Sequence, residues 1–302
     1  MSQRKTVLIT GCSAGGIGHA LAKEFHEKGL RVFATARRID SMKELEVLGI
    51  ETLALDVTDA AAVRKIRDEI VTRTGGKLDI LVNNAGQGKR RTIRPNLSNP
   101  ENIAYPVAVI DMTMDAVRTL FEVNLFAPMV MVQEFVHLLI GSGHGCIVNI
   151  GSQSGILPVP FSAAYNTSKA AIHALGNTLR VELAPFNVHV MNVITGAVRS
   201  NIAKPHTIPD NSLYKSMEAL YQAKRVNLSQ TNPTPTEEYA RTVVAEVLRP
   251  SSRAHLWAGR RSWTIWFMDR FLPRIALDWV MTRMFGFSEF AIQVRSTKDK
   301  QV

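Results

Sequence analysis

Cysteine is scarce in this chain, with only Cys12 and Cys146 among 302 residues, far apart and in no C-x-x-C pair. Two isolated thiols cannot build a disulfide framework, and they lack the spacing of a zinc site. We therefore expect a protein of a reducing compartment that is not secreted, has no disulfide and binds no metal.

Long uncharged apolar runs are missing as well. A membrane-spanning helix needs about 18 or more consecutive apolar residues, and no uncharged run of that length occurs here. Residues 1–5 lead straight into a strand-like segment and lack the apolar core of a signal peptide. We therefore expect a cytoplasmic protein without an ordinary transmembrane helix.

The charge balance is basic, with a formal net charge of +10. Such a balance is compatible with nucleic acid, a membrane surface, an anionic ligand or simply a solvated basic surface. The arginines are scattered and no nucleic-acid reading motif occurs, so we expect no nucleic-acid partner.

Strand-like and helix-like segments alternate along most of the chain. The expected strands cover residues 5–10, 31–36, 51–57, 78–82, 145–150 and 187–194, and the expected helices cover 19–29, 60–74, 111–140 and 162–185. Regular alternation predicts an α/β fold in which a doubly wound parallel sheet lies between two helical layers. We place this single domain at residues 1–258.

A glycine-rich segment, residues 10–18, separates the first expected strand from the first expected helix. It reads Thr-Gly-Cys-Ser-Ala-Gly-Gly-Ile-Gly. Glycines let the backbone approach a pyrophosphate, and a helix N-terminus offers N–H groups to it. The segment therefore predicts a dinucleotide site.

Two arginines, Arg37 and Arg38, follow the second expected strand. NAD-dependent folds of this kind carry an acidic residue there, whereas guanidinium groups suit a 2′-phosphate. Asp40 comes too late in the chain to take the acidic position. A plain basic turn is the alternative, but the pattern favours NADP.

Tyr165 and Lys169 form a Y-x-x-x-K pair inside the expected helix 162–185. A four-residue step places both side chains on one helix face. A nearby ammonium favours the phenolate form of a tyrosine and so lowers its pKa. The pair is therefore a candidate acid–base device, although the motif alone also occurs by chance.

Several motifs in order give the chain a family resemblance over about residues 5–250. They are the segment 10–18, Asp56, Asn83-Asn84-Ala85-Gly86, Asn124, Ser152, Tyr165 and Lys169. In this order they resemble the short-chain dehydrogenase/reductase family, and the 13-residue step from Ser152 to Tyr165 also fits it. The resemblance implies a Rossmann-type fold and an NADP-dependent enzyme that interconverts a ketone and a secondary alcohol by hydride transfer.

The resemblance also implies four catalytic residues. Tyr165 would donate the proton in reduction, and Ser152 would hold the substrate oxygen, with Ser154 as a competitor that the spacing disfavours. Lys169 would bind the nicotinamide ribose and lower the pKa of Tyr165. Asn124 would support a water-linked proton path to Lys169.

The cofactor contacts implied by the resemblance lie along the whole domain. They are Gly11, Ser13, Gly16, Ile17, Gly18, Arg37, Arg38, Asp56, Asn83, Tyr165, Lys169, Val198 and Ser200. Asp56 would lie by the adenine and Asn83 by its ribose, while Val198 and Ser200 would face the nicotinamide amide. The family also implies a homo-oligomer.

Two departures from the family pattern narrow the resemblance. The glycine segment has one extra residue, so Gly15 need not contact phosphate, and the sixth strand ends in Thr195-Gly196 instead of Pro-Gly. With Ala-Pro-Phe-Asn-Val at 184–188, these features resemble fungal NADPH-dependent acyl-dihydroxyacetone phosphate reductases. That group implies a lipid ketone as substrate and a place on the endoplasmic reticulum or lipid droplets.

Two alternatives to a lipid substrate stay open. Relatives of that group serve fungal secondary-metabolite pathways, where they act on a polyketide or terpenoid. A non-catalytic NADPH-binding scaffold is the other alternative, and the complete set of catalytic residue types argues against it.

Two segments depart from the plain alternation. Residues 88–104 are polar and basic and read as a disordered insertion, a phosphate- or membrane-binding arm, or a translated intron. Residues 259–302 form an amphipathic C-terminal extension, and 262–287 carry three of the four tryptophans. This stretch predicts peripheral membrane or lipid-droplet contact, with packing on the core or on a second subunit as the alternative.

Overall fold

A computed structural model describes residues 4–86, 107–199, 207–226 and 232–299. Seven parallel strands form one sheet in the order β3-β2-β1-β4-β5-β6-β7. The strands are β1 (Thr6–Thr10), β2 (Arg31–Ala36), β3 (Glu51–Ala54), β4 (Ile80–Asn83), β5 (Cys146–Ile150), β6 (His189–Thr195) and β7 (His255–Ala258). The expected doubly wound parallel sheet is confirmed, and its chain order reverses between β1 and β4, which is where such sheets bind ligands.

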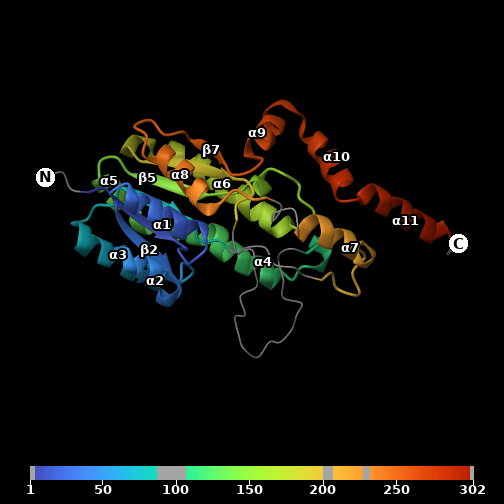
Figure 1. Ribbon diagram of the computed structural model, residues 1–302, viewed down its shortest axis with the longest axis horizontal. Helices are drawn as coiled ribbons and strands as arrows, with labels where there is room; N and C mark the ends of the chain where they lie inside the picture. The colour runs from blue at the N-terminus through green and yellow to red at the C-terminus, as the bar shows by residue number, and fades with distance from the viewer. Residues whose placement is uncertain (1–3, 87–106, 200–206, 227–231, 300–302) are drawn as a thin grey trace.

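Helices cover both faces of the sheet (Figure 1). They are α1 (Ile17–Glu27), α2 (Lys43–Val47), α3 (Ala60–Thr74), α4 (Met114–Phe121), α5 (Ala127–Gly141), α6 (Ala163–Leu183), α7 (Glu218–Tyr221) and α8 (Thr236–Val247). A C-terminal arm follows, made of α9 (Ser262–Phe271), α10 (Arg274–Met284) and α11 (Phe287–Asp299). The expected helical C-terminal extension is therefore confirmed.

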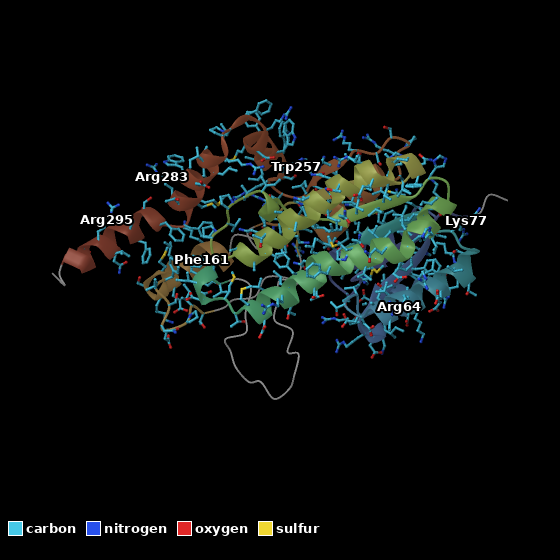
Figure 2. All side chains as sticks on the ribbon, turned by 180° about the vertical axis from the view of Figure 1, so that it is seen from behind. Arg64, Lys77, Phe161, Trp257, Arg283 and Arg295 are labelled. Carbon is cyan, nitrogen blue, oxygen red and sulfur yellow. The ribbon has the colours of Figure 1, made fainter. Side chains whose placement is uncertain are left out.

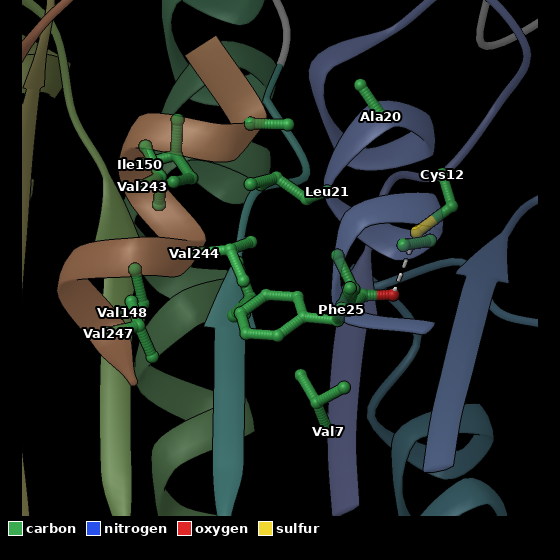
Figure 3. Close-up of a cluster of buried hydrophobic side chains, with 14 of the residues drawn as sticks. Val7, Cys12, Ala20, Leu21, Phe25, Val148, Ile150, Val243, Val244 and Val247 are labelled. Atoms are coloured by element: carbon green, nitrogen blue, oxygen red, sulfur yellow. Dashed lines mark hydrogen bonds between the residues drawn. The ribbon is translucent and has the colours of Figure 1, made fainter. Parts of the chain in front are cut away.

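The sheet buries a separate apolar core under each helical layer. On one face, Phe25 and Leu21 of α1 meet Val244 of α8 above Val7 and Val148 of the strands (Figure 3). On the other face, side chains of α3, α5 and α6 pack together against the strands. Apolar residues on both faces of each central strand explain why these strands read as nearly continuous hydrophobic runs.

One row of polar side chains crosses the sheet. Asn83, Asn149 and Asn192 are paired in register on β4, β5 and β6, and His255 continues the row on β7. The Asn83 amide donates to Asn149 Oδ1 (3.0 Å), and the Asn149 amide donates to Asn192 Oδ1 (3.2 Å). Helix α6 fits over this row because Gly176 has no Cβ; one would lie 2.0 Å from Asn192 Oδ1.

A long helical stretch connects β4 to β5. Helices α4 and α5 are joined without a break by a π-helical turn at Glu122–Phe126. Met114–Gly141 is long and apolar enough to cross a membrane by length and composition, and 44% of its apolar window is buried. Its inner side chains, including Phe135 and Leu139, belong to the core under the sheet, which accounts for the apolar composition.

The structure adds elements that the sequence pattern did not indicate. The edge strand β7 and the π turn were not expected, and the arm packs on the domain through β7 and neighbouring loops. Residues 88–104 lie outside the described ranges, so the three interpretations of that segment stay open.

Candidate active site

Tyr165 and Lys169 lie one turn apart on α6, and both are almost fully buried, at 8% and 7% exposure. The Lys169 Nζ lies 5.9 Å from the Tyr165 ring centroid and donates to the Ile150 carbonyl at the end of β5 (2.9 Å). Burial lowers the pKa of Lys169 from its usual 10.5 to about 8. This lysine can therefore exchange a proton close to neutral pH.

Ser152 follows the end of β5 in extended backbone conformation. Its Oγ accepts a hydrogen bond from the Ser154 amide at 3.1 Å, so the hydroxyl proton remains to be donated elsewhere. Ser154, the competitor for the catalytic role, takes part in this contact through its backbone. The arrangement favours Ser152 as the hydroxyl that binds a substrate oxygen.

Two glycines let the Ser152 loop lie directly on α6. A Cβ at Gly151 would lie 2.1 Å from His173 Nε2, and one at Gly155 would lie 2.7 Å from the Lys169 carbonyl carbon. Both distances are too short for any side chain. The Gly-Ser-Gln-Ser-Gly segment therefore places Ser152 against the helix that carries Tyr165 and Lys169.

His173 is a positioning residue that the sequence analysis missed. Its Nε2 accepts the backbone N–H of Ser152 at 3.2 Å, and its own carbonyl accepts from the Asn192 amide at 2.9 Å. Burial, and then the charge of Lys169, lower the pKa of His173 from 6.5 to about 4. The available signal was the i, i+4, i+8 spacing of Tyr165, Lys169 and His173, which puts all three on one helix face.

Replacement of His173 by glutamine is expected to make the free energy of unfolding less dependent on pH in acid. Below pH 6.5 the unfolded chain binds a proton at this histidine, whereas the folded chain does not do so until pH is about 4. The free energy of unfolding therefore decreases as the pH is lowered from 6.5 to about 4, by on the order of 3 kcal/mol in total. Urea unfolding at several pH values measures the difference.

An unchanged slope in His173→Gln would contradict a buried neutral His173. Glutamine can still accept the Ser152 N–H, whereas leucine cannot, so only His173→Leu is expected to lower kcat with little change in KM.

Asn124 lies in the π turn, a backbone form that often occurs at functional sites. Its Nδ2 donates to Ser168 Oγ (3.0 Å), and that hydroxyl donates to the Tyr165 carbonyl (2.9 Å). A Cβ built on Gly86 would lie 3.7 Å from both Asn124 Oδ1 and Lys169 Nζ. Asn124 and Lys169 therefore both lie close to Gly86 in the loop after β4, as a proton path from Asn124 to Lys169 requires.

The glycine segment is closed by Asn84 of the Asn-Asn-Ala-Gly motif. Asn84 Nδ2 donates to the carbonyls of Thr10 (2.7 Å) and Gly11 (3.1 Å). A Cβ at Gly18 would lie 2.4 Å from Asn84 Nδ2, and one at Gly11 would lie 2.8 Å from the Ala85 Cα. Both glycines are needed for the tight approach of β1 to β4.

The segment also opens toward solvent where a phosphate would sit. Helix α1 starts at Ile17, and Gly16 at its N-cap supplies no side-chain cap, so the first N–H groups of the helix remain for a ligand. Ser13 is exposed, and its Oγ lies 3.1 Å from Ser41 Oγ. The extra residue is accommodated by Gly15, which takes a φ of 72°.

Arg37 and Arg38 are exposed directly after β2. Asp40 pairs with Lys43 at 3.2 Å and leaves the arginines to other partners. Asp56 follows β3 and accepts from the Thr58 amide and hydroxyl at 3.1 and 2.7 Å, which forms a tight turn beside β2. The two exposed cations at this edge suit an adenosine 2′-phosphate, and the Asp56 turn orders the neighbouring end of β3.

Asn83 and Val198, two other residues expected to contact the cofactor, have buried side chains. The Asn83 side chain donates to Asn149 in the polar row, and its buried Oδ1 has no partner among the described residues. Val198 is buried after β6 and lies in a bridge with Thr234. Ser200 lies outside the described residues.

The chain's own residues fit a bound NADP. Gly15 and Gly16 carry no side chains just before α1, the α1 N-terminus is uncapped, and the exposed Arg37 and Arg38 suit a 2′-phosphate. All three features lie at the carboxyl edge of the sheet, beside the point where strand order reverses.

Comparison with known proteins gives a consistent result. The family model described as short chain dehydrogenase matches residues 5–210. The short-chain dehydrogenase RED1 of Pyricularia oryzae is 41% identical over 288 residues, covering 94% of this chain and 95% of that protein. The NADPH-dependent 1-acyldihydroxyacetone phosphate reductase of Schizosaccharomyces pombe is 38% identical over 283 residues, covering 87% and 88%.

A solved structure extends the match to the fold. The crystal structure of a short-chain dehydrogenase from Streptomyces avermitilis superposes with a TM-score of 0.75 at 25% identity, covering 97% of this chain and 99% of that one. The match therefore includes the C-terminal region as well as the sheet.

Proposed function

This chain belongs to the short-chain dehydrogenase family, and from that premise we propose that it reduces a ketone of a lipid such as acyl-dihydroxyacetone phosphate with NADPH. The expected enzyme class, a dehydrogenase or reductase, is confirmed by the family. The observation that carries the proposal is the packing of the Ser152 loop on the α6 face that holds Tyr165 and Lys169.

The bound nicotinamide supplies the hydride. Negative charge then grows on the carbonyl oxygen, and the hydroxyl of Ser152 stabilises it by donating a hydrogen bond. Tyr165 donates a proton to the same oxygen, which completes the alcohol. The ammonium form of Lys169 stabilises the phenolate that remains. Its pKa of about 8 lets it return a proton to Tyr165 and take up another along the path that Asn124 would support.

The preference for NADP is supported by Arg37 and Arg38. Guanidinium groups form charge-assisted, often paired hydrogen bonds with phosphate oxygens. A relative that is 38% identical is named as NADPH-dependent, which agrees with this edge of the site.

A lipid substrate is supported by the similarity to the 1-acyldihydroxyacetone phosphate reductase of Schizosaccharomyces pombe, which is named for such a substrate. A polyketide or terpenoid ketone stays as the second candidate, because the more similar Pyricularia relative is named only as a short-chain dehydrogenase and does not favour the lipid.

The substrate class is tested by NADPH consumption with a panel of ketones. We expect turnover of acyl-dihydroxyacetone phosphate at least about tenfold better, in kcat/KM, than of its deacylated form, because an enzyme selective for the lipid would gain free energy by burying the acyl chain. Faster turnover of polyketide ketones would favour the second candidate, and no turnover of any ketone would favour the scaffold. The expected homo-oligomer stays a prediction that sedimentation equilibrium can test.

A further inference from the structure

The C-terminal arm packs its inner side on the catalytic loop. Leu157 and Val159, which lie between Ser152 and Tyr165 in the chain, share one cluster with Ile265 of α9 and three side chains of α10 and the turn after it. Those three are Leu277, Met281 and Phe285, and all are buried. The arm therefore forms part of the support of the site, although it follows the last strand of the sheet (Figure 1).

A second contact joins the arm to the site at Phe161. Phe161 has a φ of 57°, a left-handed conformation that a bulky residue rarely adopts, directly before the helix of Tyr165. Phe287 stacks on its ring at 5.8 Å, and Tyr221 meets it edge-on at 5.1 Å. This packing holds the strained residue, so α11, α7 and the catalytic loop form one unit.

The outer side of the arm carries large apolar side chains that are exposed in the described part of the chain. They are Trp263, Phe267, Phe271, Leu272, Ile275 and Trp279. Trp263 is 65% exposed, Ile275 71% and Trp279 59%. On α9, Trp263, Phe267 and Phe271 are spaced four residues apart, as are Ile275 and Trp279 on α10. Each helix therefore has an exposed apolar stripe on the face opposite its buried residues.

The stretch that carries these stripes has an excess of basic residues. Residues 261–283 hold four arginines (Arg261, Arg270, Arg274, Arg283) and two aspartates (Asp269, Asp278). The Arg283 guanidinium lies 4.5 Å from the Trp279 ring centroid, and Figure 2 shows Arg283 on the edge of the arm away from Phe161. Tryptophan and arginine together suit the interface of a bilayer, where rings lie among headgroups and cations meet phosphates.

We propose that the outer side of the arm docks this protein on a lipid surface that carries anionic headgroups. A second copy of the chain fits less well, because a two-fold interface would bring the same arginine-rich patch against itself. The inner side of the arm holds the catalytic loop, so docking would place the site next to the lipid phase. The docking does not depend on the proposed reaction.

Vesicle binding tests the docking surface. Full-length protein is mixed with phosphatidylcholine vesicles, with or without about one third phosphatidylserine, and bound protein is measured by flotation. We expect binding to the anionic vesicles, weakened when salt rises from about 0.1 M to about 1 M. Phe267→Ser with Trp279→Ser is expected to lower the partition coefficient at least about tenfold, since each removes an apolar ring from the interface.

Phe186→Ser serves as the matched control, because Phe186 is an exposed aromatic at the far end of α6. It and the catalytically impaired Tyr165→Phe should both bind vesicles like the wild type, which separates docking from the reaction. Equal binding by the double variant and the wild type would overturn the proposal. So would a concentration-dependent dimer that the double variant abolishes, with no vesicle binding by either.

Discussion

Tyr165→Phe is expected to lower kcat by about 10³-fold while NADPH binds as in the wild type. The change removes one oxygen and keeps the buried ring, so the fold is preserved, but no proton donor remains at the carbonyl oxygen. General acid catalysis contributes about 10² to 10⁴ in rate, which sets the size of the effect. NADPH oxidation at saturating ketone measures kcat, and cofactor fluorescence titration measures binding.

Tyr214→Phe is the control for loss of a tyrosine hydroxyl elsewhere in the chain. Tyr214 meets the Phe161 ring edge-on at 5.5 Å through its own ring, which phenylalanine keeps. This variant should retain kcat within about twofold, because its hydroxyl takes no part in the proposed proton transfer. Full activity of Tyr165→Phe would show that the proton comes from another group.

The second large effect is expected from Arg37→Ser combined with Arg38→Ser. Each charge-assisted hydrogen bond to a phosphate contributes about 1.5–3 kcal/mol, so kcat/KM for NADPH should fall about 10²-fold or more. NADH lacks the 2′-phosphate, so its kcat/KM should change little. The ratio of the two values, measured with one ketone, isolates the contribution of the phosphate.

Arg64→Gln is the control for a general change in net charge. Arg64 lies on α3 and pairs with Glu134 at 3.9 Å, so its charge is engaged within the chain. Its ratio of NADPH to NADH efficiency should match the wild type. An equal loss with both cofactors in the double arginine variant would indicate a structural defect instead of lost phosphate recognition.

The fold could be predicted from the sequence because its signals are local. Alternating apolar segments and a glycine turn after the first strand are sufficient to indicate a doubly wound sheet. The grouping of Ser152 with Tyr165 and Lys169 could be expected only through the family resemblance. The structure adds the physical reason, which is the absence of Cβ atoms at Gly151 and Gly155.

The features that the sequence did not indicate depend on contacts between distant residues. Strand β7 has four residues and becomes a strand because β6 offers it a free edge. The π turn at Asn124 is a shift in backbone hydrogen bonding that helical periodicity does not reveal. The role of His173 depends on an amide 21 residues earlier, so helix spacing places His173 on the face of Tyr165 and Lys169 but does not show what it binds.

The row of Asn83, Asn149 and Asn192 has a consequence for how the sheet assembles. Neighbouring strands rich in valine and isoleucine can slide past one another with little loss of apolar contact. A slip of one residue between β5 and β6 would turn the Asn192 amide to the opposite face and leave buried polar groups unpaired, a cost of about 1–3 kcal/mol for each group. The three amides therefore favour a single register of these strands during folding. The same register fixes the position at which the chain leaves β5 and leads into Ser152.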